Sequence, residues 1–450
     1  MAFTPQQAIL ELGSAFYDPV TPARFPQTIL RFRNDRAAAS VGLDGLSDVE
    51  WIAHFGRFEP LPGSLTQPLA LRYHGHQFRV YNPEIGDGRG FLFAQMTDAR
   101  GRLLDLGTKG SGQTPYSRFG DGRLTLKGGV REILATEMLE ALGVETSKTF
   151  SLIETGEELQ RNDEPSPTRS AVLVRLNHGH IRIGTFQRLA YLQEPDAIRQ
   201  LTDYVLRHYY GEGPGDDAPQ RLLAHVAART ARMAGQFMAA GFVHGVLNSD
   251  NINVTGESFD YGPWRFAPSW SPGFTAAYFD HAGLYAFGRQ PEAIYWDVMQ
   301  LASALRLIAE EEPLIEALDG FPEAFQREVA EALLWRLGVT PRGAEHDRPL
   351  VQAMERALSG TETPIDRFFF DAFGGRLPAS YGEPFAELRA QLEHYRPRKR
   401  RAHDYWTDAK PCAMLIDEVE AIWAAIAADD DWTPLEAKVN AIRRMGEALA

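Results

Sequence analysis

The segment from His244 to Pro263, HGVLNSDNINVTGESFDYGP, constrains the fold of this chain more than any other. Asn251 lies seven residues after His244, and Asp260 then opens an Asp-Tyr-Gly turn. An amide oxygen and a carboxylate oxygen suit Mg²⁺, because this ion takes its remaining ligands from phosphates and water. The segment therefore predicts a metal and phosphate site formed by two successive loops.

The same segment resembles the catalytic centre of a protein-kinase-like fold with one residue replaced. In kinases, a loop that begins with His carries the catalytic Asp two residues later and a metal-binding Asn seven residues later, and an Asp-aromatic-Gly turn follows. Here the position of the catalytic Asp holds Val246, which has no group that accepts a proton. The pattern keeps both metal ligands and lacks the usual base, which disfavours ordinary phosphoryl transfer to a hydroxyl group.

Asp250 is the candidate for the missing base. It directly precedes Asn251 and lies four residues after Val246. A carboxylate beside a metal ligand is placed to accept a proton from an incoming hydroxyl group. The alternative is a structural cap within the loop. We favour the catalytic role because the loop otherwise lacks a base.

A glycine-rich loop, a lysine and a glutamate precede this segment in the order of a kinase-like N-lobe. In the motif GDGRG, Gly86 and Gly88 allow the backbone to approach a phosphate, and Arg89 adds a guanidinium suited to bidentate phosphate contact. A plain hairpin turn is the alternative for this motif. Lys109 follows on or just after the next expected strand, and Glu132 lies on the expected helix beyond it. We expect Lys109 to contact phosphate and Glu132 to hold Lys109.

A second loop rich in Gly and Arg, SRFGDGR at residues 117–123, lies just ahead of that helix. The backbone N–H groups at a helix N-terminus attract anions, so this loop is a candidate anion site. An exposed turn is the alternative.

Two arginines are expected to face each other across a hairpin. In VLVRLNHGHIRIG the turn centres on His178 and Gly179, which pairs Arg175 with Arg182. Like charges directly opposite each other on neighbouring strands are destabilising, so this register suggests a bound polyanion between them. The alternative is a pair that spreads into solvent at the mouth of the hairpin. Without nearby Cys or carboxylate ligands, His178 and His180 are interpreted as structural.

Strand patterns come first along the chain and amphipathic helices follow. The runs FLFAQM (91–96) and LLDLG (103–107) predict a hairpin, and residues 126–142 predict a helix. The predicted fold class is α+β, a bilobal protein-kinase-like fold with a β-rich N-lobe that carries a long helix and a mainly helical C-lobe. We expect four parts: an irregular N-terminal extension packed on the core (1–80), the N-lobe (81–193), the C-lobe with catalytic loop 244–263 (194–380) and a C-terminal helical extension (381–450).

Composition limits the possible classes of function. A hydrophobic content of 44% and a charged content of 24% are typical of a soluble globular protein. The net charge of −14 disfavours a nucleic-acid binder, and no apolar run is long enough to span a membrane. The basic cluster at 396–401 is interpreted as a solvated helix end or loop, with an anion or nucleic-acid patch as the minor alternative. The lone Cys412 allows no internal disulfide, and we expect a cytoplasmic monomer.

Several long segments resemble the selenoprotein O family, whose members are protein adenylyltransferases with a pseudokinase fold. The matching segments are YHGHQF (73–78), GDGRG (86–90), KGSGQTPYSRFGDGR (109–123), REILATE (131–137), VRLNHGHIRIGTF (174–186) and the catalytic segment 244–263. The resemblance implies that ATP binds in an orientation reversed relative to kinases. AMP would then be transferred to Ser, Thr or Tyr hydroxyl groups of proteins, with Mg²⁺ or Mn²⁺ as the metal.

The resemblance also implies a role for each matching residue. It makes Asp250 the proton acceptor, Asn251 and Asp260 the metal ligands, and Glu132 the support of Lys109. Nucleotide contacts are implied for Gly86, Gly88, Arg89, Lys109, Asp121, Gly122, Arg175, Arg182 and Asp260.

The chain departs from the family pattern at two places. Its C-terminal segment has no cysteine where members typically carry a redox motif, and Arg79 follows HQF where the family usually has Gly. Two other functions stay open from the residues alone: a conventional kinase-like phosphotransferase and a non-catalytic nucleotide-binding scaffold. Val246 disfavours the first, and the complete set of Lys, Glu, Asn and Asp positions disfavours the second.

Overall fold

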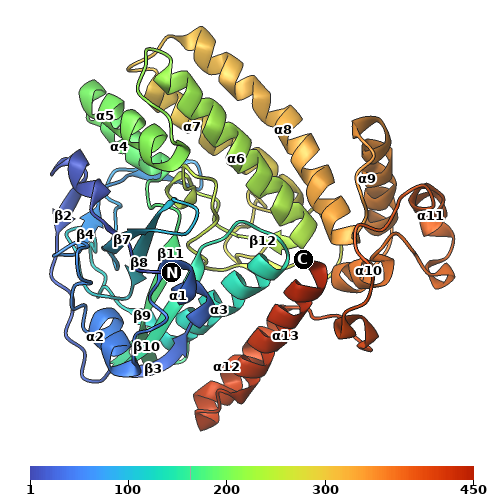
Figure 1. Ribbon diagram of the computed structural model, residues 1–450, viewed down its shortest axis with the longest axis horizontal. Coiled ribbons are helices and arrows are strands. Elements are labelled where there is room, and N and C mark those ends of the chain that lie inside the picture. The colour runs from blue at the N-terminus through green and yellow to red at the C-terminus, as the bar shows by residue number, and fades with distance from the viewer. Residues whose placement is uncertain (163) are drawn as a thin grey trace.

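A curled antiparallel sheet and one long helix form the lobe that carries the glycine-rich loops (Figure 1). The computed structural model describes residues 1–162 and 164–450. Within this part, seven strands follow the order β2-β4-β7-β8-β11-β10-β3, while β1 pairs with β7 and β9 with β11. The strands are β1 (Pro5–Gln6), β2 (Tyr17–Pro19), β3 (Ile29–Arg33), β4 (Leu69–Leu71), β7 (Leu92–Thr97), β8 (Leu103–Lys109), β9 (Leu124–Thr125), β10 (Lys148–Leu159) and β11 (Thr168–Asn177).

Two elements of this lobe are confirmed as predicted. Strands β7 and β8 form the expected hairpin, with Thr97 opposite Leu103. Helix α3 (Leu126–Ala141) begins at Thr125, whose side chain accepts a hydrogen bond from the backbone N–H of Gly128. All seven residues of β8 are buried, so Lys109 at its end is held in place by packing along the whole strand.

The predicted second hairpin is wrong. Strand β11 ends near the expected position, but residues 183–191 form helix α4 (Ile183–Tyr191) instead of a returning strand. Ile183, Phe186 and Leu189 are buried at three-residue steps, which is the spacing of one helix face. The short alternating run at 180–186 also fits a strand, so the local pattern alone was ambiguous. Arg175 and Arg182 are therefore not cross-strand partners.

The first 80 residues are more regular than expected. Strands β1 to β4 belong to the main sheet, and helices α1 (Asp35–Val41) and α2 (Asp48–Gly56) cover part of it. A separate hairpin follows, formed by β5 (Gly75–Gln77) and β6 (Val80–Asn82). The expectation of an irregular segment is wrong here because several of these strands are only two or three residues long, too short to give a sequence pattern. The proposed division of the chain into four parts stays a prediction.

The second lobe is helical, as predicted. Helices α6 and α8 run parallel to each other as its long pair, and α13 returns to lie against α3 of the first lobe (Figure 1). Its helices are α4, α5 (Pro195–Val205), α6 (Ala218–Ala240), α7 (Gln290–Leu305), α8 (Glu311–Leu337), α9 (Ala344–Ser359), α10 (Ile365–Ala372), α11 (Ala386–Leu392), α12 (Ile416–Asp429) and α13 (Thr433–Leu449). The bilobal fold class predicted from the sequence is thereby confirmed.

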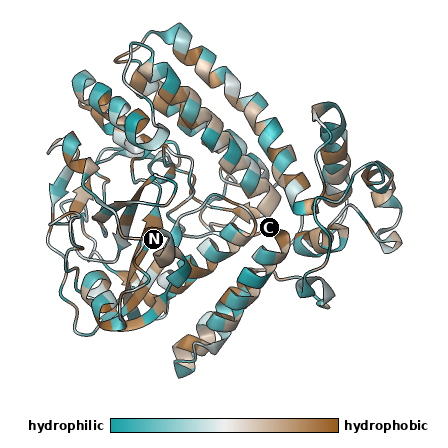
Figure 2. Cartoon of the chain, in the orientation of Figure 1, coloured by the Kyte–Doolittle hydropathy of each residue, from teal (hydrophilic) through white to brown (hydrophobic). Residues whose placement is uncertain are grey.

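Hydrophobic residues concentrate in the central strands, while the outer helices alternate hydrophilic and hydrophobic positions (Figure 2). This distribution is expected where each helix buries one stripe and exposes the other. None of the described helices combines the length and the hydropathy that crossing a membrane requires.

Candidate active site

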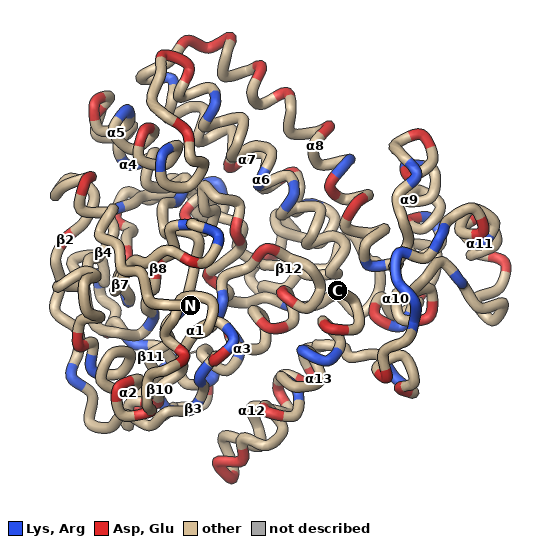
Figure 3. Tube along the Cα trace, in the orientation of Figure 1, with Lys and Arg blue, Asp and Glu red and all other residues tan. Residues whose placement is uncertain are grey.

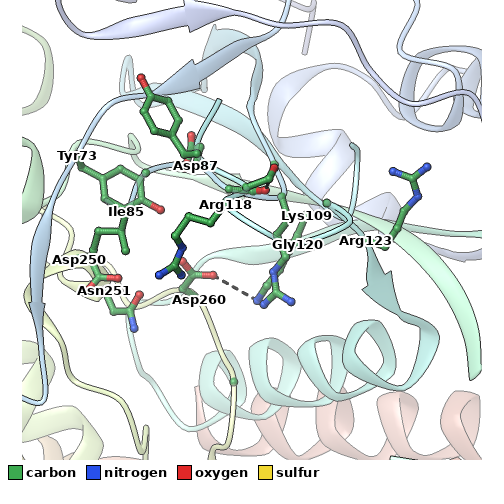
Figure 4. Close-up of a pocket in the computed structure, with 18 of the residues that line it drawn as sticks. Tyr73, Ile85, Asp87, Lys109, Arg118, Gly120, Arg123, Asp250, Asn251 and Asp260 are labelled. Carbon is green, nitrogen blue, oxygen red and sulfur yellow. Dashed lines mark hydrogen bonds and ion pairs between the residues drawn. The ribbon is translucent and has the colours of Figure 1, made fainter. Parts of the chain in front are cut away.

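A cavity of about 810 Å³ lies where the two lobes meet, and it gathers most of the residues singled out from the sequence (Figure 4). Both glycine-rich loops, Lys109 of β8, Arg175 of β11, Arg182 before α4 and the catalytic loop line it. In Figure 4, Asp250, Asn251 and Asp260 lie together on one side, whereas Arg123 lies apart from them. Residues as far as 173 positions apart in sequence, such as His76 and Ser249, are joined by hydrogen bonds at the catalytic loop.

Lys109 and Glu132 form the buried ion pair expected from the sequence. The Nζ atom of Lys109 lies 2.7 Å from Oε2 of Glu132, and 7% and 1% of the two side chains are exposed. Strand β8 fixes the lysine and helix α3 fixes the glutamate. The pairing is present in the structure, and what Lys109 binds stays a prediction.

Asp260 lies among three cations. Its carboxylate is 3.0 Å from Arg175, 3.1 Å from Arg182 and 3.3 Å from Lys109. Burial opposes ionisation of this carboxyl group, but Arg175, Lys109 and Arg182 outweigh it and hold the pKa of Asp260 well below its ordinary value. Its φ angle of 66° turns the chain sharply in the Asp-Tyr-Gly segment, which directs the carboxylate into the cation cluster.

Arg175 and Arg182 converge without the predicted hairpin. Both guanidinium groups lie over the ring of Phe259, at 4.9 Å and 4.8 Å from its centre, and Arg182 also lies over Tyr73. Both side chains are buried, and neither Nε atom has a hydrogen-bond partner among the described residues. A buried donor without a hydrogen-bond partner is unfavourable. Both Nε–H groups are therefore available to donate to acceptor atoms of a ligand. The sequence prediction was right about the convergence and wrong about the backbone that produces it.

Asp250 is buried beside this cluster. Burial raises the pKa of its carboxyl group to about 6, although Arg182 acts in the opposite direction. Its Oδ1 atom has no hydrogen-bond partner among the described residues. A carboxylate with such a pKa is deprotonated near neutral pH and still basic enough to take up a proton.

Asn251 is oriented for a metal. Its Nδ2 atom donates a hydrogen bond to the carbonyl oxygen of Val246 at 2.9 Å, which leaves the side-chain oxygen as the free acceptor. In the described part of the chain, no group of three or more His, Cys, Asp or Glu side chains is placed to hold a metal ion. The amide oxygen of Asn251 and the carboxylate of Asp260 line the same cavity and are the ligand types of a hard cation such as Mg²⁺, which takes its other ligands from phosphate and water.

The two glycine-rich loops pack against each other at the cavity rim. A Cβ atom at Gly86 would lie 2.5 Å from the ring of Tyr116, and one at Gly90 would lie 2.0 Å from the carbonyl oxygen of Thr108. Glycine is therefore required for this close packing, whatever the loops bind. Arg89 is exposed and lines the cavity.

Asp121 and Gly122 belong to the second loop. Gly122 has a φ of 70°, and a Cβ atom there would lie 2.3 Å from the backbone of Gly112. The Asp121 carboxylate is exposed and accepts a hydrogen bond from Arg161 at 2.8 Å. The interpretation of this loop as an anion site stays a prediction.

Four residues at the site were not singled out from the sequence. Tyr73 and Phe259 support the arginines, Asp87 lies 3.4 Å from Arg182, and Gly75 lies against Asp250. Tyr73 and Gly75 lie in the motif YHGHQF, for which the spacing of residues gives no chemical signal. Only the folded chain shows that this motif reaches the catalytic loop.

Comparison with known proteins gives a consistent family. A family model described as protein adenylyltransferase SelO matches residues 1–376. The protein nucleotidyltransferase YdiU of Synechococcus elongatus is 42% identical, with 99% of this chain and 96% of that protein aligned. The YdiU protein of Vibrio vulnificus strain YJ016 is 36% identical over 92% of this chain and 85% of that protein.

Among solved structures, the kinase domain of a rhoptry antigen from Toxoplasma gondii aligns with 59% of this chain and 83% of its own length. The sequence identity is 9% and the TM-score is 0.28, which is too low to carry an argument about fold or function.

Proposed function

The chain belongs to the SelO family of protein adenylyltransferases, and from this premise we propose how its site transfers AMP from ATP to protein hydroxyl groups. ATP binds with its triphosphate reversed relative to kinases, so that the γ end lies at the cluster of Lys109, Arg175 and Arg182. The acceptor is a Ser, Thr or Tyr side chain. Residues proposed to contact the nucleotide are Gly86, Gly88, Arg89, Lys109, Asp121, Gly122, Arg175, Arg182 and Asp260.

The cation cluster is the observation that carries this proposal. Three buried or nearly buried cations converge within 3.3 Å of Asp260, and the Nε–H groups of Arg175 and Arg182 have no partner among the described residues. Glu132 and Asp87 offset part of the positive charge, but the unpaired donors and the exposed Arg89 in the same cavity favour a polyanion. A terminal phosphate held at this end directs the α-phosphate toward the catalytic loop.

Asn251 and Asp260 are the proposed holders of Mg²⁺ or Mn²⁺. A divalent ion there would offset negative charge on the leaving diphosphate. The arginines and Lys109 hold the triphosphate in position, so most of the rate would come from positioning and electrostatics instead of covalent catalysis.

Asp250 is the proposed proton acceptor. It takes the proton of the acceptor hydroxyl as that oxygen attacks the α-phosphorus. The bond between the α-phosphorus and its bridging oxygen then breaks, and diphosphate leaves with its electron pair. Val246 leaves the usual kinase position without a base, which is why transfer of the γ-phosphate is not the favoured reaction.

The small-molecule product tests this function. The purified protein is incubated with ATP, Mg²⁺ and a mixture of acceptor proteins, and nucleotides are separated by ion-exchange chromatography. We expect diphosphate that depends on the acceptor and is lost in Asp260→Ala. Formation of ADP would instead indicate a phosphotransferase, and intact ATP with retained binding would indicate a scaffold. The expectations of a cytoplasmic monomer that binds neither nucleic acid nor membranes stay predictions.

A further inference from the structure

The β5–β6 hairpin carries the motif YHGHQF and lies directly on the catalytic loop. The backbone N–H of His76 donates to Oγ of Ser249 at 2.8 Å, and that of Phe78 donates to Oδ1 of Asn248 at 3.1 Å. A Cβ atom at Gly75 would lie 2.9 Å from Cβ of Asp250. The hairpin therefore forms one wall beside the proposed base.

The tip of the hairpin is held in a fixed conformation. Phe78 and Arg79 have φ angles of 51° and 61°, the left-handed region that a two-residue hairpin turn requires. Arg79 lies 3.1 Å from Glu292 and over the ring of Trp296, so α7 anchors the tip. Left-handed backbone at non-glycine residues persists only where the surrounding structure holds it in place. The position of the tip is therefore well determined.

A second segment, Tyr278–Tyr285, packs against that tip. The ring of Phe78 contacts the rings of Phe279 and Tyr285, with centres 5.7 Å and 5.0 Å apart. The hydroxyl group of Tyr285 donates to the same Asn248 oxygen at 2.7 Å. The carboxylate of Asp280 accepts hydrogen bonds from two backbone N–H groups of this segment and fixes its turn.

Both segments expose large apolar side chains near the tip: Val80 directly follows the turn, and the ring of Phe279 contacts those of Phe78 and Tyr278. Val80, Tyr278 and Phe279 are 69%, 81% and 42% exposed. Single exposed apolar residues are ordinary, but a contiguous group on a fixed frame marks a binding surface. Arg79, which directly precedes Val80, pairs with Glu292 at 3.1 Å, so this cation is offset beside the apolar side chains.

The surface adjoins the catalytic loop. The tip and Tyr285 both contact Asn248, which is two residues before Asp250, so the Cα atoms of Asn248 and Asp250 are at most about 7 Å apart. Asn248 and Asp250 line the same cavity as the glycine-rich loops and the cation cluster. We propose that Phe78, Val80, Tyr278 and Phe279 form an acceptor platform that binds a segment of the target protein, and that it selects segments with an apolar or aromatic side chain a few residues from the acceptor hydroxyl. This inference rests on the proposed function.

A peptide library tests the acceptor platform. Each peptide has one central Tyr, Thr or Ser in a polar background, and one Leu is moved stepwise from five residues before it to five residues after it. The double variant Val80→Ser/Tyr278→Ser is compared with the wild type. Val49→Ser is the matched control, because Val49 is a 75% exposed valine on α2, outside the platform.

In the wild type and in Val49→Ser, we expect Leu at one or two positions to raise kcat/KM for AMP transfer roughly tenfold, the scale of one small apolar contact. The double variant should lose this preference and keep the same KM for ATP. An unchanged preference in the double variant, or none in the wild type, overturns the acceptor platform. A dimer that dissociates in the double variant also overturns it, because the surface then belongs to a second copy.

The outcomes separate the two proposals. Transfer of AMP to whole proteins without any peptide preference rejects the acceptor platform alone. Release of ADP in place of diphosphate, with every acceptor, rejects the proposed function and the platform with it.

Discussion

At the scale of single residues, Asp260 lies within 3.3 Å of the three cations that are proposed to bind phosphate. Without nucleotide it neutralises Lys109, Arg175 and Arg182, and with nucleotide it is proposed to hold the metal. These two tasks can be separated, because the first competes with phosphate binding and the second supports the reaction.

Asp260→Ala should therefore lower AMP transfer by on the order of 100-fold or more, the effect of losing one preorganised electrostatic group. Its affinity for ATP in the presence of EDTA should be equal to or higher than that of the wild type, because the cations lose their internal competitor. Isothermal titration calorimetry without metal, together with transfer rates in Mg²⁺, measures both. A metal-free affinity that falls along with the rate would contradict this assignment.

The pKa of Asp250 predicts a pH profile. Burial raises this pKa to about 6, and a general base acts only when deprotonated. The value of kcat/KM should therefore rise about tenfold per pH unit below pH 6 and level off above it. Glu257 is the control, because burial raises its pKa to about 7 although it does not line the cavity. Glu257→Gln should keep the acidic limb, and a flat profile from pH 5 to 8 in the wild type would rule out Asp250 as the base.

At the scale of elements, the sequence predicted those helices and strands whose pattern lies within their own residues. Helix α3 and the β7–β8 hairpin have their own periodicity and turn, and both were predicted. Helix α4 was missed because the run that leads into it alternates like a strand, and its helical face becomes evident only where it is buried against α5 and α7. The pairing of Lys109 with Glu132 was predictable from the order of elements, whereas the contact of Gly75 with Asp250 was not.

The β5–β6 hairpin should be sensitive to a single methyl group. In Gly75→Ala the new Cβ would lie 2.9 Å from Cβ and 3.1 Å from the backbone nitrogen of Asp250, so the hairpin or the base must shift. We expect kcat for AMP transfer to fall on the order of 10-fold to 100-fold, as displacements near 1 Å at a reacting group do. ATP affinity should change little.

Gly45→Ala is the matched control for that variant, because a Cβ atom at Gly45 has no neighbour within 4 Å. Steady-state kinetics of both variants, with thermal melting to confirm folding, measures the effect. Equal activity of the two variants would show that the hairpin does not position Asp250.

At the scale of the whole molecule, the C-terminal helices connect the lobes. Helix α13 lies along α3, the helix that carries Glu132 (Figure 1). The basic stretch at 396–401, visible as a blue run beside α10 in Figure 3, contributes to this arrangement. Arg398 and Lys399 donate to the last carbonyl oxygens of α13, those of Leu449 and Glu447. From its charge alone this stretch is interpreted as a solvated helix end or loop, and the fold shows that part of it caps a helix C-terminus.

Arg443 joins α13 to α3 through a buried carboxylate. Its guanidinium forms two hydrogen bonds with Glu137, whose side chain is 3% exposed. Arg443→Ala should lower the free energy of unfolding by about 2–3 kcal/mol, because it leaves a buried carboxylate with weaker partners. Arg356→Ala is the control and should change it by less than about 1 kcal/mol, because Arg356 and Glu387 are each 58% exposed. Urea denaturation measures both, and equal effects would contradict the role of Arg443.

The central claim is that the α-phosphate, and not the γ-phosphate, is delivered to the acceptor. The most direct measurement incubates the purified protein and acceptor proteins with ATP labelled separately at the α- and γ-phosphates, followed by intact-mass analysis of the proteins. The account predicts label from the α position only, with a mass increase equal to AMP, and no label in Asp250→Asn. Label from the γ position would contradict the reversed nucleotide and would require another explanation for Val246.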